Sequence, residues 1–357
     1  MDRRTLLAGA GTVAVAAAST FPTPALAQGL RELNLVTDWA PNSFNQGIAE
    51  RLAERINGAL NGKIRVNVFA AGALVDAFET FDAVSAGVAD MYHSSEYYWF
   101  DRSPAFAFFT TVPFGLTSSE MTGWILHAGG QVLWDELSAG FGIKPLLAGN
   151  TGVQMGGWYN KELTSVDDYK GLKVRIPGIG GEMLRRLGAT VVNLPSVDIV
   201  PALQSGALDA AEWTGPANDL SLGLHKVAKF YYYPGCHEPG TIDVLGINKT
   251  VWDGLGAEEQ HVIQMAAIAE NSYATTLSAV KNLPALQTLI KDHGVQLRKF
   301  DDSILAAQSK AAAEVLAEIA NKDPLTGRVY ESFSAFRNSI MQWSDLSERA
   351  FLNARSL

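Results

Sequence analysis

One arginine stands where an anionic ligand could be bound. Arg175 lies in LKVRIPG (172–178), an alternating segment whose Leu172, Val174 and Ile176 point to the opposite face. A Pro-Gly pair follows, so Arg175 stands at the carboxyl end of a predicted strand, where open α/β sheets bind ligands. A guanidinium can bind a carboxylate through two parallel hydrogen bonds. A surface salt bridge is an equally good interpretation of the pattern alone.

Two oxygen-bearing side chains could hold a cation. Glu212 follows GALDAA (206–211) at the end of another predicted strand. The residues before it are small, so apolar packing does not explain a glutamate at this position. Gln154 lies in VQMGGWY (153–159) and offers a neutral oxygen. Carboxylate and amide oxygens are the preferred ligands of hard cations. An ordinary hydrogen bond at a domain seam is the alternative for each residue.

Aromatic residues and a glycine-rich turn could complete a pocket. Trp99, Trp158 and Trp213 could wall a small cavity, although single tryptophans more often belong to the core. The turn GIGG (178–181) lacks the third glycine of a dinucleotide fingerprint, but it could present helix-start N–H groups to an anion.

Signatures of common enzymes are absent from the sequence. It contains no nucleophile elbow, zinc-protease motif or phosphate-binding loop, and its six histidines show no metal-ligand spacing. His237-Glu238 precedes Pro239-Gly240, which cannot continue the helix that a zinc protease needs. We therefore expect a binding protein and not an enzyme.

The elements that must position these residues alternate between strand and helix, which predicts an α/β fold with mostly parallel sheets. From residue 258 the chain is predicted to be helical, with breaks at Pro284, Gly294 and Asp323-Pro324. The predicted elements are strands at 33–36, 62–70, 89–93, 153–159, 173–176 and 190–193, helices at 45–60, 76–86, 181 onward and 197–205, and an aromatic loop at 96–109.

An internal echo suggests two related halves. AVSAGVAD (83–90) and ALQSGALD (202–209) each follow a predicted helix and lead into a strand. Gly87 and Gly206 would then end helices, and each segment closes on an aspartate at a strand entry. Eight residues are too few to prove duplication.

The amino terminus reads as an export signal. Arg3-Arg4, an apolar run from Leu6 to Ala18 and the cleavage site Ala25-Leu26-Ala27 predict a cleaved signal peptide at 1–27, of the twin-arginine (Tat) type rather than the Sec type. The expected location is the periplasm. The chain carries 28 basic and 37 acidic side chains, and removal of the signal leaves 26 and 36. This acidic balance argues against nucleic acid as a partner.

Three longer segments carry a resemblance to a known family. They are NTGVQMGGWYNKELTSVDDYKGLKVRIPGIGGEMLRRLGA (150–189), SGALDAAEWTGP (205–216) and YYYPGCHEPGT (231–241). In these segments the chain resembles the DctP-like solute-binding proteins of tripartite ATP-independent periplasmic (TRAP) transporters, in the branch that binds 2-oxo acids such as pyruvate. Cys236 stands where an aromatic residue is expected.

The resemblance implies a fold and a site. The fold is a two-domain α/β periplasmic binding protein of class II type, with crossover strands, a long connecting helix and a C-terminal helical extension. Arg175 falls on the carboxylate-binding arginine of the family, and the cation ligands fall on Gln154, Glu212 and the main-chain carbonyl of Trp213. Tyr98, Trp99 and Glu238 complete the expected substrate-binding set. The implied domains are 28–152 with about 240–280, 153–239 with about 281–322, and a C-terminal helix at 323–357.

The expected function is capture of a small 2-oxo monocarboxylate for the TRAP membrane subunits. Charge counting favours Na⁺ as the cation, because Arg175, Glu212, a monoanion and Na⁺ cancel, whereas Ca²⁺ needs another carboxylate, for which Glu238 is a candidate. A receptor for lactate or another 2-hydroxy acid with Ca²⁺ is the alternative, and a periplasmic metal-dependent lyase is a remote one. The apolar seam of the C-terminal helix either packs on its own domain or forms a homodimer by exchange between protomers.

Overall fold

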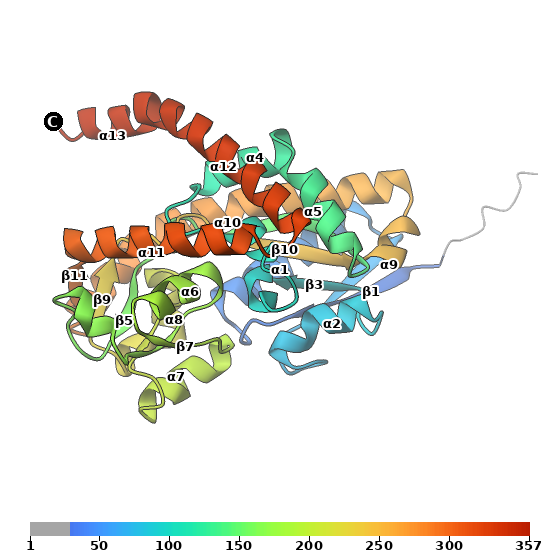
Figure 1. Cartoon of the computed structure of the whole chain (residues 1–357). Helices are drawn as coiled ribbons and strands as arrows, with labels where there is room; N and C mark the ends of the chain where they lie inside the picture. Colours follow the sequence, from blue (N-terminus) through green and yellow to red (C-terminus); the bar gives the residue numbers. More distant parts are fainter. Residues whose placement is uncertain (1–28) are drawn as a thin grey trace, which may run out of the picture.

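Two mixed β-sheets divide the chain into two halves in the computed structural model, which describes residues 29–357 (Figure 1). The predicted signal peptide lies outside the described residues. Half I is built on the sheet β2 (Ile64–Phe69), β1 (Arg31–Thr37), β3 (Met91–Ser94), β10 (Ile242–Asn248) and β4 (Ile143–Asn150), in that order. Half II is built on β11 (Gln296–Lys299), β9 (Phe230–Tyr233), β5 (Gly157–Tyr159), β8 (Ala210–Ala211), β6 (Lys173–Arg175) and β7 (Thr190–Val192).

Each sheet combines a parallel part with antiparallel strands. In half I, β1 pairs in parallel with β2 and β3, and β10 runs antiparallel to β3 and β4. In half II, β6 pairs in parallel with β7 and β8, and β5 runs antiparallel to β8 and β9. The expectation of mostly parallel sheets is therefore right for the strands that carry the site and wrong for the strands that join the halves.

Two extended connections cross between the sheets. The first, residues 151–156, joins β4 to β5, and the second, residues 234–241, joins β9 to β10. They are hydrogen-bonded to each other, since the Thr151 N–H donates to Thr241 O at 3.0 Å and the Gln154 N–H donates to Glu238 O at 3.1 Å. The close approach requires Gly235, because a Cβ there would lie 2.3 Å from Gln154 O. These crossings place residues of two distant segments side by side.

One 35-residue helix connects the halves. This helix, α10 (Ala257–Lys291), packs on β4 and α1 of half I and on α8 of half II. Pro284 lies inside it, so the predicted break there is wrong, because packing against both halves outweighs the lost backbone hydrogen bond. The break predicted at Asp323-Pro324 is confirmed, with Asp323 capping the helix that follows.

The remaining helices cover the sheets or extend from them. No helix between residues 29 and 357 is long and apolar enough to cross a membrane. The α-helices are α1 (Phe44–Ala59), α2 (Thr80–Ser85), α3 (Phe106–Thr110), α4 (Ser118–His127), α5 (Gly130–Ala139), α6 (Gly178–Arg186), α7 (Ser196–Gln204), α8 (Pro216–Leu222), α9 (Lys249–Asp253), α11 (Asp302–Ala320), α12 (Pro324–Ser344) and α13 (Ala350–Ala354). The 3₁₀ turns are η1 (Ala77–Glu79), η2 (Glu96–Trp99), η3 (Val166–Tyr169) and η4 (Leu224–Lys226), and a π-helical turn, η5 (Asp345–Arg349), joins α12 to α13.

Several local expectations are corrected by these bounds. The segment 96–109, expected to be a loop, contains η2 and α3, because its aromatic side chains are buried in half I. The strand expected at 153–159 is only β5, since residues 153–156 belong to the first crossing. The helix expected from Gly181 begins at Gly178.

The internal echo has a structural counterpart. Asp90 accepts a hydrogen bond from the Asn34 N–H at 2.7 Å and donates its own N–H to Asn34 O. Asp209 does the same with Lys173, at 2.9 Å from the Lys173 N–H. The two aspartates thus join equivalent parallel strand pairs, β1–β3 and β6–β8, and this agreement supports related halves.

Candidate functional site

Arg175 lies at the carboxyl end of β6 and is completely buried. Its Nε donates to Leu194 O at 3.0 Å, and its Nη1 donates to Glu212 O at 2.9 Å and to Glu212 Oε2 at 3.3 Å. Its Nη2 reaches only the Tyr98 hydroxyl, at 3.4 Å. One edge of the guanidinium is therefore fixed by the protein, while the Nη2 edge keeps donor capacity for an anion.

Glu212 follows β8 directly and is 2% exposed. Burial raises the pKa of its carboxyl well above the usual range, and the Arg175 guanidinium opposes this rise. Its Oε1 has no hydrogen-bond partner. Glu212 thus contacts Arg175 through one oxygen, while its other oxygen makes no hydrogen bond in the described chain.

Gln154 lies on the first crossing with its amide orientation fixed. Its Nε2 is within hydrogen-bond distance of Glu238 Oε2 at 2.8 Å and of the Thr151 and Thr241 hydroxyls, each at 3.1 Å. Because these three acceptors hold the amino group, Oε1 must point elsewhere, and it is buried without a partner. The amide therefore presents a free oxygen, as a cation ligand would.

The second crossing adds His237 and Glu238 to the same place. His237 Nε2 lies 3.4 Å from Glu212 Oε1 and is also buried without a partner. Glu212, His237 and Glu238 each offer one ligand atom, and these atoms all lie within 4.8 Å of one another. Burial and the charge of Glu212 raise the pKa of Glu238 to about 8. This cluster is rich in acceptors, and it suits a cation better than a lone anion.

The start of α6 and the η2 turn close the site from two sides. Gly180, in the first turn of α6, packs so closely on the second crossing that a Cβ there would lie 3.3 Å from the Cβ of His237. A helix start favours negative charge, so α6 supports an anion beside Arg175. From half I, Tyr98 reaches across to Arg175, and the Asn193 amide donates to Tyr98 O at 3.4 Å. The site therefore lies at the seam between the halves.

The structure brings together most, but not all, of the residues singled out in the sequence. Arg175, Glu212, Gln154, Glu238, Trp213 and Tyr98 lie together, with the guanidinium carbon of Arg175 5.2 Å from the centre of the Trp213 ring. Trp99 does not join them: its indole N–H donates to Phe78 O and its ring packs on Phe81. Trp158 is a core residue, with its indole N–H on Asp219 and its ring stacked on Tyr231.

His237 was not singled out as a ligand because the sequence offered only the failed zinc-protease pattern for it. The signal that could have found it is its place in the HEPG turn, one residue before Glu238. Only the pairing of the two crossings brings it to Glu212.

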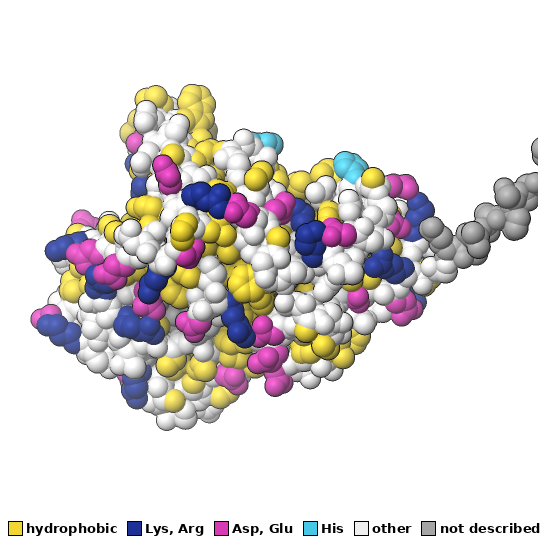
Figure 2. All heavy atoms as spheres, turned by 45° about the vertical axis from the view of Figure 1, so that its right-hand side comes forward, with side chains coloured by type: hydrophobic (Ala, Val, Ile, Leu, Met, Phe, Trp, Pro, Cys, Tyr) yellow, Lys and Arg dark blue, Asp and Glu magenta, His cyan; other side chains and the backbone are white. Residues whose placement is uncertain are grey.

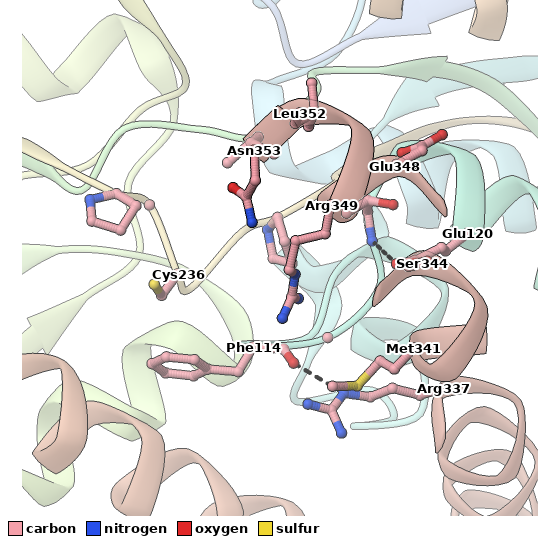
Figure 3. A pocket seen from close by; sticks show the side chains of 16 residues that line it. Phe114, Glu120, Cys236, Arg337, Met341, Ser344, Glu348, Arg349, Leu352 and Asn353 are labelled. Carbon is pink, nitrogen blue, oxygen red and sulfur yellow. Dashed lines mark hydrogen bonds between the residues drawn. The ribbon is translucent and has the colours of Figure 1, made fainter. Parts of the chain in front are cut away.

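A separate open cavity lies outside this site (Figure 3). It measures about 520 Å³ and lies between the C-terminal extension (residues 324–357) and the outer side of the second crossing. Arg337, Met341 and Arg349 line it from the extension, and Phe114 and Cys236 line it from the body, with Arg337 Nε donating to Phe114 O at 3.0 Å. Arg175 and Glu212 do not line this cavity, so it is no part of the candidate site.

The chain matches one protein family over most of its length. Residues 35–323 match the DctP family, described as bacterial extracellular solute-binding protein, family 7. A monocarboxylate 2-oxoacid-binding periplasmic protein of Nostoc sp. is 40% identical over an alignment 367 residues long, which covers 100% of this chain and 99% of the relative.

Two solved structures of TRAP periplasmic solute-binding proteins share the fold. The protein from Pseudoalteromonas atlantica, with bound sodium and pyruvate, is 35% identical and superimposes with a TM-score of 0.87 over 90% of this chain and 98% of that chain. The protein from Colwellia psychrerythraea, with bound calcium and pyruvate, is 37% identical, with a TM-score of 0.87 over 91% and 99%. The chain therefore belongs to the DctP family of TRAP-transporter solute-binding proteins, and its two-sheet α/β fold with crossing connections and a long linking helix is the fold of that family.

Proposed function

We propose that this chain is the periplasmic receptor of a TRAP transporter and that it captures a small 2-oxo monocarboxylate, such as pyruvate, together with a cation. One observation carries the proposal. Beside the fully buried Arg175, two buried oxygens, Gln154 Oε1 and Glu212 Oε1, have no partner in the described chain. Leaving buried polar atoms unpaired is costly, so two such oxygens beside a buried guanidinium favour a bound group at this place.

A 2-oxo acid with a cation satisfies both kinds of group at once. Its carboxylate can accept from the Nη2 edge of Arg175, where only the Tyr98 hydroxyl now stands at 3.4 Å. Its carboxylate and neighbouring carbonyl form a chelating pair for a cation held by Gln154, Glu212 and the main-chain carbonyl of Trp213. The cation supplies the positive charge that lets the anion lie beside Glu212. The relatives that bind pyruvate with sodium or calcium support this assignment.

Both Na⁺ and Ca²⁺ are compatible with the charges of the site. Na⁺ balances Arg175, one ionised glutamate and a monoanion. Glu238, within 4.8 Å of Glu212 at their ligand atoms, is the second carboxylate that Ca²⁺ needs for balance. We propose that Glu238 decides which ion is held, because its ionisation supplies the charge by which the two balanced sets differ.

Closure of the two halves is the proposed mechanism. Arg175 and the cation ligands belong to half II and the crossings, whereas Tyr98 belongs to half I. A ligand held at the seam bridges the halves and stabilises the closed form, which the membrane subunits would recognise. In this mechanism the protein releases the ligand unchanged and catalyses no reaction. Recovery of unaltered ligand from the denatured complex is the expected result, and a converted product would contradict it.

The C-terminal extension is proposed to form a homodimer. Val329 and Phe333 of α12 are buried against the body, but Trp343 and Leu346 are 65% and 78% exposed. Figure 2 shows hydrophobic side chains gathered on the part that protrudes from the body. An exposed apolar surface of this kind favours association.

Thermal unfolding tests the proposal. Protein that has been unfolded and refolded to remove co-purified ligand is heated with 2-oxo and 2-hydroxy acids, in buffers that contain Na⁺, Ca²⁺ or neither. A bound ligand at one hundred times its Kd adds about 2.7 kcal/mol of stability. We expect stabilisation by pyruvate that requires a cation. No response to any short organic acid would leave the family assignment intact and the ligand class wrong.

A further inference from the structure

A buried carboxyl faces the proposed site from half I. Asp38 follows β1 directly and is 2% exposed. Its Oδ2 accepts a hydrogen bond from the Ser94 hydroxyl at 2.7 Å, at the end of the neighbouring parallel strand β3. Its Oδ1 is buried and has no partner. Asp38 thus stands at the carboxyl edge of the half I sheet, as Arg175 stands at the carboxyl edge of the half II sheet.

The residue after Asp38 reaches across the seam toward Arg175. The ring of Trp39 lies edge-on against the ring of Trp213, with 6.3 Å between their centroids. The Trp213 ring in turn lies 5.2 Å from the Arg175 guanidinium carbon. The carboxyl end of β1, which bears Asp38, therefore faces the ligand site across the seam.

The free oxygen discriminates between ligand tails. An alkyl tail directed at half I would leave Oδ1 buried and unpaired, which is unfavourable. A hydroxyl on the tail can donate to an ionised Asp38, or accept from a protonated one and donate elsewhere. The hydroxyl is therefore favoured in either protonation state of Asp38.

We propose that Asp38 is a specificity-determining residue, and that it selects 2-oxo monocarboxylates with a hydroxyl on carbon 3 over alkyl analogues of the same shape. This inference rests on the proposed function, since it concerns the tail of the acid that Arg175 and the cation hold. The Tyr98 hydroxyl, also from half I, faces the guanidinium at 3.4 Å.

Hydroxypyruvate and 2-oxobutyrate are a matched pair of probes, because they differ by a hydroxyl in place of a methyl group. Isothermal titration of the refolded mature protein is made with each acid, in saturating Na⁺ and in saturating Ca²⁺. We expect hydroxypyruvate to bind at least about tenfold more tightly than 2-oxobutyrate, because the methyl group of 2-oxobutyrate leaves one buried oxygen of Asp38 unpaired. In Asp38→Val the preference should fall to about one or reverse.

Asp243→Asn serves as the control. Asp243 is a buried carboxyl at the same edge whose Oδ1 accepts from the Ser95 hydroxyl at 2.9 Å. Unlike Asp38, it has no fully buried oxygen without a hydrogen-bond partner in the described chain. The tenfold preference should therefore survive in this variant.

The outcomes separate this inference from the proposed function. Equal binding of the two probes by the unaltered protein overturns the role of Asp38 and leaves the receptor function standing, and this result needs no variant to fold. An unchanged preference in folded Asp38→Val overturns it as well. If neither probe binds, and pyruvate does not bind either, the proposed function itself fails.

Discussion

Replacing Arg175 by lysine tests the centre of the proposed site. Lysine keeps the positive charge beside Glu212 but loses the planar fork, so a carboxylate held by two parallel hydrogen bonds would keep one at most. Hydrogen bonds to charged groups contribute about 1.5–3 kcal/mol each. We therefore expect Arg175→Lys to weaken pyruvate binding by about 10-fold to 150-fold.

Replacing Arg175 by alanine should affect folding as well as binding. The guanidinium is completely buried and donates to Leu194 O and to Glu212, so its removal leaves the Glu212 carboxyl without a counter-charge. Removing one partner of a buried ion pair costs about 3–5 kcal/mol. Protonation of Glu212, whose pKa burial already raises, reduces this cost. We expect Arg175→Ala to be less stable than Arg175→Lys in urea and to bind no measurable pyruvate.

Isothermal titration with pyruvate, on refolded protein and with saturating cation, gives the affinities. Arg185→Lys is the matched control, because Arg185 lies on the neighbouring α6 with half of its side chain exposed and pairs only with Glu182 and a backbone carbonyl. Its affinity for pyruvate should stay within about twofold of the unaltered protein, as exposed ion pairs contribute little. If folded Arg175→Lys also stays within twofold, the carboxylate does not bind at Arg175 and the site is wrong.

Three further predictions follow from the structure. Glu238→Gln removes the second carboxylate. The affinity for pyruvate, taken from thermal unfolding, should therefore fall at least about tenfold more with Ca²⁺ than with Na⁺. Equal losses of affinity with the two ions would contradict its role. Burial raises the pKa of Glu96 to about 7, so the folded state loses stability as pH rises from about 4.5 to 7. In urea, Glu96→Gln should therefore be more stable than the unaltered protein by about 3 kcal/mol at pH 8 and by little at pH 4.5. The same difference at both pH values would refute the assignment. A chain that ends at Ser344 lacks Leu346 and the exposed apolar residues after it, so sedimentation should show more monomer than for the full chain. An unchanged distribution would exclude the segment after Ser344 as the interface.

Strand and helix patterns were enough to locate the residues of half II. The alternation in LKVRIPG predicted β6 with Arg175 at its carboxyl end, on the face opposite to Leu172, Val174 and Ile176, and the small residues before Glu212 predicted a polar group at a strand end. The complete burial of Arg175 did not follow from this pattern, which fits a surface salt bridge equally well. These predictions succeed because the two-residue period of a strand and the edge at which it ends are local properties. The echo of Asp90 and Asp209 was visible for the same reason.

The long helices and the crossings were harder to predict because distant contacts decide them. Pro284 breaks an isolated helix, yet α10 continues through it because the helix packs on both halves. Val153 to Gly156 alternates like a strand, but the residues leave one sheet for the other. The aromatic segment at 96–109 folds into short helical turns because the interior of half I buries it.

The sequence by itself determined the α/β alternation, the family resemblance and the positions of Arg175 and Glu212 at strand ends, whereas Gln154, expected inside a strand, lies on a connection. The tertiary structure decided which atoms remain free. Pairing of the two crossings brought His237 and Glu238 to Glu212 and engaged the Gln154 amino group, so that its oxygen is left unpaired. Packing of half I also separated Tyr98, which reaches Arg175, from Trp99, which does not. A free oxygen is defined by every neighbour around it, and those neighbours come from segments that no local pattern connects.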